Sequence, residues 1–386
     1  MKFTVNKSVL IEALTPAMGS ISTKNSITSI EGVLLETLDD GRIQLSTYDM
    51  NKGVRAFFTP NSVERTGRYI INGHRFYQTL KVLPDDEITI DINENLNCQI
   101  YSGKANFSIF AMKGEDFPSF PDLVSDRGFE ISSLTLKKMI NKVQHSVAVL
   151  DNRAMLMGAY FKISEEGMEV VSCDSYTLSK CTIKCEISSL NRDNTPPSFS
   201  FIIPGHALSE LTKILPDDDE YKCTFYLSRK HAIVRCDDII FFTRTIDSEY
   251  IDYNRIIPKD NNIFVTVNKE RLLSALERAN IIAEEKGQNS RKSYVKLQVD
   301  YKSLIITSSS ANGKVIDEMD AIHEGDDIEI GFNGRYLVNS VRVAEGEEIK
   351  ITLVSPTKAI TIIPTETSEE FDYLYMILPM RMNEER

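Results

Sequence analysis

Residues 70–86 read IINGHRFYQTLKVLPDD, and residues 202–218 read IIPGHALSELTKILPDD, with the same spacing from the apolar dipeptide to the proline. A third version begins GFNGRYL at residues 331–337. Each copy predicts a strand that runs into an amphipathic helix, because a β-branched or aromatic run is followed by apolar residues at helical spacing. Proline ends the helix in the first two copies. The chain is therefore expected to contain one structural unit three times.

A second repeated motif supports this division. The sequence TVNK occurs at residues 4–7 and again at residues 266–269, and a fainter copy begins near Phe129. The apolar residues that follow are in step: Leu10, Ala13 and Leu14 correspond to Leu272, Ala275 and Leu276. Each unit thus holds two strand–helix halves. We predict three domains, at residues 1–126, 127–257 and 258–386, each of ordinary domain size.

Alternating runs surround the predicted helices. Residues 87–92 read EITIDI and residues 350–354 read KITLV, the pattern of strands with one face in contact with water. The fold class is therefore predicted to be α+β, with two helices in each domain packed on antiparallel sheets.

The composition is that of a soluble globular protein, with 42% hydrophobic and 26% charged residues among 386. No apolar run is long enough to span a bilayer, and the first residues lack a signal peptide pattern, so we expect a cytoplasmic protein. The six cysteines include no C-x-x-C pair, which argues against a disulfide framework or a zinc site. We expect neither a metal nor a cofactor.

Motifs for catalysis are missing from the sequence. It contains no phosphate-binding G-x-x-x-x-G-K-[ST], no G-x-G-x-x-G and no G-x-S-x-G. His74 and His206 occupy matching helix starts, which favours a structural or phosphate-facing role over catalysis. The sequence therefore predicts a binding protein rather than an enzyme.

Charge is distributed unevenly along the chain. The net charge is −12, but the six predicted helix windows (7–18, 73–83, 135–146, 205–215, 269–280 and 334–344) hold twelve basic and four acidic residues. Lysine and arginine are good helix formers and decorate many surface helices, yet glutamate is equally good and is scarce here. A basic helical layer in an acidic protein indicates a surface that faces a polyanion. Few side chains suited to base edges occur there, so contact would be mainly with phosphates.

Several segments in order resemble the β subunit of bacterial DNA polymerase III, the sliding clamp. They are MKFTV at residues 1–5, DFPSFP at 116–121, the R-x-x-L-x-G pattern from Arg153 to Gly158, IGFN at 330–333 and LPMRM at 378–382. The resemblance covers the whole chain. It implies a non-catalytic subunit of the polymerase holoenzyme, a head-to-tail homodimer with six domains around a hole. Twelve helices spaced ~8–10 Å apart would enclose a circle of ~35 Å diameter, ample for duplex DNA.

The resemblance also implies partners and site residues. The partners are encircled duplex DNA, the polymerase III catalytic subunit, the clamp loader, and other polymerases and repair proteins bound through short peptides. The basic residues expected to face DNA are Lys24, His74, Arg75, Lys81, Lys137, Lys138, Lys142, Arg153, Lys213, Arg278, Arg335 and Arg342.

The C-terminal segment is unusually apolar for a chain end. One interpretation is a final strand buried in the third domain; the other is a peptide-docking cleft, for which flexible methionines are suited. The resemblance supports the cleft, lined by Leu156, Cys173, Ser175, Tyr176, Thr177, Leu178, Ile251, Arg255, Ile256, Asn333, Tyr336, Met376, Ile377, Leu378, Pro379, Met380, Arg381 and Met382. This lining departs from the family pattern in two places. The sequence SYTL at residues 175–178 replaces the usual G-H-R-L, and Ile251 replaces a usual proline. The resemblance therefore does not determine the polar rim of the cleft or which peptides it prefers.

The dimer surface is inferred in the same way. Phe107 and Ile109 of one chain should meet Ile281 and Ile282 of the other, although alternation alone would equally fit a core role for the first pair. Two other classes of function compete with the clamp. A nucleic-acid-modifying enzyme would need an acidic metal cluster, which the sequence does not suggest. A scaffold that binds only proteins does not explain the basic helices.

Overall fold

The computed structural model describes residues 1–386 except 23–26, 85–86, 284–293, 311–312, 367–370 and 383–386. The chain divides into two compact units. The first unit comprises Met1–Lys137, Ser188–Pro197 and His206–Thr245, and the second comprises Lys138–Ile187, Ser198–Gly205 and Ile246–Arg386. The division runs through the central repeat, so each unit contains one complete repeat and part of the central one.

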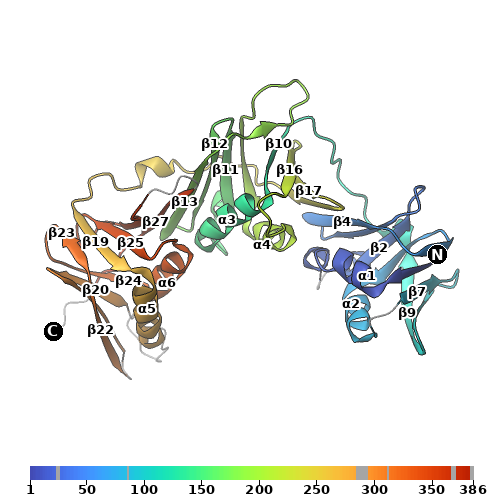
Figure 1. Cartoon of the computed structure of the whole chain (residues 1–386), viewed down its shortest axis with the longest axis horizontal. Helices are drawn as coiled ribbons and strands as arrows, with labels where there is room; N and C mark the ends of the chain where they lie inside the picture. Colours follow the sequence, from blue (N-terminus) through green and yellow to red (C-terminus); the bar gives the residue numbers. More distant parts are fainter. Residues whose placement is uncertain (23–26, 85–86, 284–293, 311–312, 367–370, 383–386) are drawn as a thin grey trace. The chain divides into compact units, whose positions relative to one another are not determined.

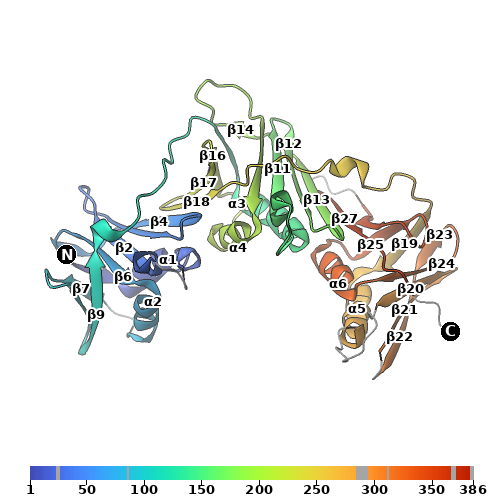
Figure 2. The ribbon, with the colours of Figure 1, turned by 180° about the vertical axis from the view of Figure 1, so that it is seen from behind.

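The six predicted helix windows all form helices. In the described part of the chain the α-helices are α1 (Lys7–Leu14), α2 (Gly73–Val82), α3 (Ser133–Val143), α4 (Gly205–Ile214), α5 (Lys269–Ala283) and α6 (Gly334–Val343). The residues that repeat in the sequence are the buried ones: Leu10, Ala13 and Leu14 in α1, and Leu272, Ala275 and Leu276 in α5. Within the second unit, α5 and α6 lie side by side (Figure 1, Figure 2).

The asparagine-glycine pairs of the repeat motif have two structural roles. The side-chain oxygen of Asn72 accepts a hydrogen bond from the Arg75 amide at 3.0 Å, and that of Asn333 accepts one from the Arg335 amide at 3.1 Å. Both caps satisfy amides that a helix start leaves unpaired. The glycine that follows leaves room for a neighbour, since a β-carbon at Gly73 would lie 2.3 Å from Ile21 Cδ1. The motif thus fixes where the second helix of a repeat begins.

The first unit is built on a sheet with the strand order β14-β10-β16-β17-β18-β4-β3-β2-β6-β9-β8-β7-β1-β5. The central repeat joins the first repeat through the antiparallel pair β18–β4, where Phe241 lies opposite Val54. The strands are β1 (Lys2–Asn6), β2 (Gly32–Thr37), β3 (Ile43–Tyr48), β4 (Lys52–Phe58), β5 (Ser62–Arg65), β6 (Arg68–Asn72), β7 (Glu87–Ile92), β8 (Asn97–Ser102), β9 (Ala105–Lys113), β10 (Gly128–Ser132), β14 (Ser188–Ser189), β16 (Lys222–Leu227), β17 (His231–Cys236) and β18 (Ile239–Arg244).

The second unit contains two sheets, with the orders β15-β11-β12-β13-β27-β26-β25-β19-β23 and β22-β21-β20-β24. The central repeat joins the third repeat through β13–β27, where Leu178 lies opposite Met376. The strands are β11 (Gly158–Ser164), β12 (Gly167–Cys173), β13 (Thr177–Lys184), β15 (Phe199–Pro204), β19 (Ile263–Asn268), β20 (Val295–Asp300), β21 (Ser303–Ser309), β22 (Lys314–Asp320), β23 (Ile322–Glu324), β24 (Ile328–Phe332), β25 (Glu348–Leu353), β26 (Ile360–Pro364) and β27 (Phe371–Ile377). Helices on antiparallel sheets confirm the α+β prediction.

Candidate functional site

The exposed cations of helix α2 are the simplest part of the predicted DNA surface. His74, Arg75 and Lys81 are all exposed, and the Lys81 ammonium lies 4.3 Å from the centre of the Tyr77 ring. Lys81 occupies the same helix position as Lys213 in α4 and Arg342 in α6, and all three side chains are exposed. The repeat thus presents a cation at one helix position three times. Lys24 lies outside the described residues.

Several predicted cations form ion pairs with nearby acids. Arg342 is 2.9 Å from Glu277, and Lys213 is 3.1 Å from Glu210. The remaining pairs of this kind are Arg278 with Asp317 at 2.7 Å and Lys137 with Asp217 at 2.7 Å. Arg342, Lys213 and Arg278 are more than half exposed, and ion pairs of exposed cations contribute little to stability and are screened by salt, so these three can exchange partners with a phosphate. Lys137 is only 19% exposed and also donates to the Leu215 carbonyl at 3.2 Å, so it is held in place. Arg335, at the start of α6, is exposed as well.

Lys142 corrects one prediction, because it does not face solvent. Its side chain is 4% exposed, and its ammonium lies 2.7 Å from a Glu345 carboxylate oxygen and 4.9 Å from the centre of the Tyr373 ring. Its neighbour Lys138 is partly exposed and lies 5.5 Å from the Phe371 ring. Lys142 therefore joins the central repeat to the third repeat within the second unit, and its assignment as a DNA-facing residue was wrong.

Arg153 belongs to a loop rather than to a helix face. It donates hydrogen bonds to both carboxylate oxygens of Asp151, at 3.0 and 2.9 Å, and another to the Ser175 hydroxyl. Hydrogen bonds from Arg153 lower the pKa of the Asp151 carboxyl to about 2. The guanidinium is half exposed, so it can face a polyanion while it fixes the loop at Ser175.

The predicted peptide-cleft residues fall into a buried layer and an exposed rim. Leu156, Cys173, Leu178 and Met376 are at most 5% exposed and form one apolar cluster, with Ile251 packed against it. In the adjacent pairing of β13 with β27, Thr177 lies opposite Ile377, and both are buried. Tyr176, Ile256 and Leu378 are exposed, at 58%, 46% and 39%. The structure therefore brings many of the predicted residues together, with apolar side chains at the surface above an apolar layer.

The C-terminal tail continues beyond its strand. β27 ends at Ile377, after which the Leu378 amide donates to the Tyr176 carbonyl at 2.9 Å and the Met380 amide donates to the Gly331 carbonyl at 2.8 Å. Met382 is close to Gly331 as well, whereas Arg381 is exposed. The interpretation as a buried strand is confirmed as far as Ile377, and a partly exposed tail with Pro379 follows it. The peptide-docking cleft stays a prediction.

Other predicted rim residues have additional local roles. Asn333 caps α6, and Tyr336 stacks on Tyr176 with ring centres 5.9 Å apart. Arg255 is exposed and pairs with Asp252 at 2.8 Å.

The sequence analysis did not predict the aromatic residues that pack in and beside the apolar cluster of Leu178 and Met376. Tyr250 stacks on Tyr160 with centroids 5.1 Å apart, and the Tyr253 hydroxyl donates to Glu169, which also pairs with Lys180 at 2.6 Å. These contacts hold the segment around Ile251 against β11 and β12. The closely spaced tyrosines at 250 and 253 were the available signal, but their partners lie too far away in sequence to be inferred.

The predicted dimer residues lie on two surfaces in different units. On β9, Phe107 is 37% exposed and Ile109 is partly exposed; on α5, Ile281 is 68% exposed and Ile282 is partly exposed. None of the four belongs to the buried core, which removes the alternative considered for Phe107 and Ile109. Phe110, also on β9, is 87% exposed and was not predicted.

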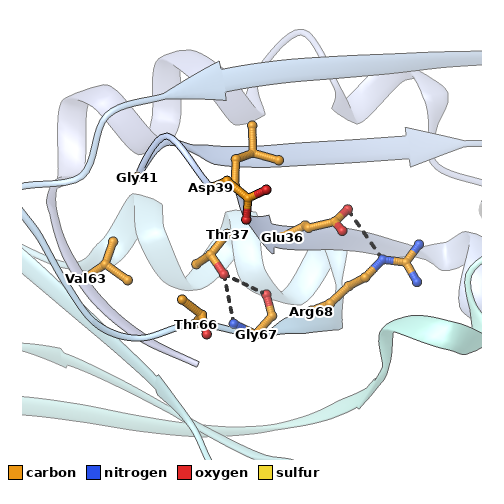
Figure 3. A pocket seen from close by; sticks show the side chains of 9 residues that line it. Glu36, Thr37, Asp39, Gly41, Val63, Thr66, Gly67 and Arg68 are labelled. Carbon is orange, nitrogen blue, oxygen red and sulfur yellow. Dashed lines mark hydrogen bonds and ion pairs between the residues drawn. The ribbon is translucent and has the colours of Figure 1, made fainter.

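No group of three or more His, Cys, Asp or Glu side chains could hold a metal ion within the described ranges. A pocket of about 640 Å³ lies in the first unit beside β2 and β6, and its polar groups bond to one another: Glu36 pairs with Arg68 at 3.4 Å, and Thr37 bonds with Gly67 (Figure 3). It contains none of the predicted site residues. No described helix is long and apolar enough to cross a membrane.

Two of the buried thiols are unsuited to nucleophilic chemistry. Burial raises the pKa of both Cys98 and Cys181 to about 12. Such thiols stay protonated at neutral pH and are poor nucleophiles.

Comparison with known proteins gives one consistent family. Models of the N-terminal, central and C-terminal domains of the DNA polymerase III beta subunit match residues 1–121, 130–252 and 254–381. The beta sliding clamp of Bacillus subtilis is 26% identical over 391 residues, covering 99% of this chain and all of the relative. That of Streptococcus pneumoniae serotype 4 is 26% identical, with 99% of each chain covered.

Solved structures agree with this assignment. The DNA polymerase III beta chain of Streptococcus pneumoniae superposes with a TM-score of 0.90 at 25% identity, and the sliding clamp of Bacillus subtilis does so with a TM-score of 0.88 at 25% identity. Both comparisons cover 99% of this chain and 100% of the other. The three repeats are three clamp domains, and the chain belongs to the DNA polymerase III beta subunit family, the beta sliding clamps.

Proposed function

We propose that this chain is a non-catalytic DNA sliding clamp, which encircles duplex DNA and tethers the replicative polymerase and other DNA-processing proteins. The observation that carries the proposal is the match to beta sliding clamps along 99% of the chain. The exposed cations at one helix position of each repeat supply the physical mechanism, because they attract phosphates without reading base sequence. Residues 1–126, 127–257 and 258–386 are the proposed domains, and the cytoplasm is the proposed location.

A ring requires two chains, and two strand edges are suited to join them. Residues 105–110 of β9 pair with β8 on one side, and among the described strands β22 pairs only with β21. The first segment is flanked by Lys104 and Lys113, whereas β22 carries Asp317, Glu318 and Asp320. Opposite charge and free backbone groups favour contact between such edges. Phe107 and Ile109 would then meet Ile281 and Ile282 of the partner chain.

Partner proteins would bind through the surface around the C-terminal tail. Peptide grooves draw affinity from a few apolar anchors, and the exposed Tyr176, Ile256 and Leu378 offer contacts of this kind. The proposed partners are the polymerase III catalytic subunit, the clamp loader, and other polymerases and repair proteins that carry short peptide motifs.

The DNA surface can be tested by removing the three equivalent cations together. Lys81→Ala, Lys213→Ala and Arg342→Ala in one protein should weaken binding to linear duplex DNA and reduce the slope of log affinity against log salt by roughly 1 to 3. A matched control replaces three exposed lysines outside the helices, Lys162, Lys230 and Lys302. Equal loss in both proteins would contradict a DNA surface made of helices.

A further inference from the structure

Two cysteines of the central repeat face each other across the neighbouring strands β16 and β17 (Figure 1). The pairing of these strands sets Thr224 opposite Arg235, and the same register carried one residue further sets Cys223 opposite Cys236. Side chains of opposite residues lie on the same face of a sheet, and both cysteines are buried, at 0% and 4% exposed. The hairpin between the strands, rather than a C-x-x-C spacing, brings the two thiols together.

The hydrogen-bond pattern of the two strands gives this pair the closer of the two possible backbone spacings. In the hairpin that joins β16 to β17, the Ser228 amide donates to the His231 carbonyl at 2.9 Å. Hydrogen-bonded and non-hydrogen-bonded pairs alternate along antiparallel strands, so counting from Ser228 makes Cys223 and Cys236 a non-hydrogen-bonded pair. The α-carbons of such a pair are about 4.5 Å apart, within the range of roughly 4.4–6.8 Å that a disulfide spans. A bond between the two sulfurs therefore requires little movement of the backbone.

The two thiols interact in the reduced protein. A hydrogen bond with Cys236, followed by burial, raises the pKa of the Cys223 thiol. Cys223 also donates a hydrogen bond to the Ile131 carbonyl, at 3.5 Å from its sulfur. Cys223 therefore keeps its proton, which leaves Cys236 as the sulfur that reacts first.

A tyrosine and an aspartate lie at the end of the strand pair that holds the thiols. Tyr221 precedes β16 and Asp237 follows β17, and the phenol donates a hydrogen bond to the carboxylate. Burial and then this hydrogen bond raise the pKa of Tyr221, and the nearby Cys236 and Cys223 add to the effect. Asp237 is exposed and has a φ of 45°, a left-handed conformation that aspartate adopts in turns. The thiols thus lie next to an exposed turn, where local opening needs less free energy than in the middle of a sheet.

We propose that Cys223 and Cys236 are a modification site, at which hydrogen peroxide enters past the Tyr221–Asp237 pair and converts the two thiols into a disulfide. The Cys236 sulfur attacks one peroxide oxygen and the O–O bond breaks, which gives a sulfenic acid, while the other oxygen leaves with the thiol proton as water. The Cys223 sulfur then attacks the sulfenic sulfur and the S–O bond breaks, so the hydroxyl leaves with the Cys223 proton as a second water. The two sulfurs lose two electrons in total, and the peroxide gains them.

The neighbouring thiol keeps this oxidation reversible. A sulfenic acid without a thiol partner is oxidised further to a sulfinic acid, which thiol reductants do not restore. An ionised sulfinate is unfavourable in an apolar core, whereas a disulfide is uncharged and is reduced by thiol exchange. The pair thus protects the central repeat from irreversible damage by peroxide. It belongs to neither the proposed DNA surface nor the proposed peptide surface, so the inference does not rest on the proposed function.

Mass spectrometry of the full-length protein tests the site. The background is Cys185→Ser, which removes an exposed thiol and with it disulfides between molecules. The reduced protein is treated with hydrogen peroxide, remaining thiols are blocked with N-ethylmaleimide, and the chain is cut with trypsin, which cleaves after Arg229 between the two cysteines. We expect the peptides that carry Cys223 and Cys236 to be joined, and dithiothreitol to separate them.

Three variants in this background test the assigned roles. Cys98→Ala removes a buried cysteine that lies opposite Ile109 and should leave the link unchanged. In Cys223→Ala, Cys236 should proceed to a sulfinic acid that dithiothreitol does not restore. Tyr221→Phe should form the disulfide roughly 2- to 10-fold faster, because it lacks one hydrogen bond that closes the site.

Circular dichroism establishes that each variant is folded. The site would be overturned by peptides that stay separate at a peroxide dose that oxidises Cys185 in the wild type, or by a Cys236 that remains a free thiol in Cys223→Ala. An unchanged rate of disulfide formation in Tyr221→Phe would overturn the assigned path of entry.

Discussion

Single residues on the basic helices differ sharply in what their charge does. Lys81 is exposed, whereas Lys142 is buried against Glu345 and Tyr373. Lys142→Met should lower the free energy of unfolding by about 1 kcal/mol, because it removes the ion pair with Glu345 and the contact of the ammonium with the Tyr373 ring, and should leave DNA affinity unchanged. Lys81→Met should give the opposite pattern: unchanged stability and weaker, less salt-dependent DNA binding. Denaturant unfolding and DNA titration of both variants check this, and weaker DNA binding by Lys142→Met would restore the original assignment.

The burial of His145 can be tested through the pH dependence of the free energy of unfolding. It follows α3, is stacked edge-on against Tyr375, and lies 3.1 Å from the Ser179 hydroxyl. Burial lowers the pKa of His145 from 6.5 to about 4. Between these values the unfolded chain binds more protons than the folded one, so stability falls as the pH drops from 6.5 to about 4. The loss amounts to at most about 3 kcal/mol.

Two variants isolate this effect. In His145→Gln the part of the pH dependence that comes from this group should disappear, as measured by denaturant unfolding at a series of pH values. His74→Gln, at an exposed helix start, should keep the full dependence. An identical slope in the wild type and His145→Gln would show that another group is responsible.

Secondary-structure elements were the most predictable level of this protein. The six helices follow from apolar spacing, and asparagine caps fix the starts of α2 and α6; all of these signals lie within a dozen residues of one another. Side-chain contacts between residues far apart in the sequence could not be predicted from these local patterns. The burial of Lys142 depends on Glu345, and the exposed face of Tyr176 depends on Tyr336. The family resemblance indicated which residues would form the proposed peptide surface, but it could not distinguish the buried residues among them from the exposed ones.

The exposed end of α5 provides a test of the proposed dimer interface. Ile281→Asp places a carboxylate in the proposed interface, at a cost of several kcal/mol for an unpaired buried ion. The chain should become a folded monomer of 43.7 kDa instead of a dimer, as measured by gel filtration with light scattering. The control Ile322→Asp changes an isoleucine of similar exposure on β23 and should remain dimeric. A dimeric Ile281→Asp protein would place the interface elsewhere.

The whole molecule has a net charge of −12, yet in its six predicted helix windows twelve basic residues stand against four acidic ones. An acidic protein has little general attraction for DNA, so firm retention must come from topology rather than from the strength of individual phosphate contacts. A closed ring threaded on DNA leaves only by opening or by sliding off an end. Salt weakens phosphate contacts but does not break such a link.

The most direct measurement compares retention of the protein on circular DNA and on linear DNA at high salt. The protein is loaded onto nicked circular DNA by a clamp loader, half of the sample is linearised with a restriction enzyme, and both halves are separated from free protein by gel filtration. The account predicts that the protein stays with the circles and is lost from the linear DNA. Equally fast loss from circular and linear DNA would contradict encirclement.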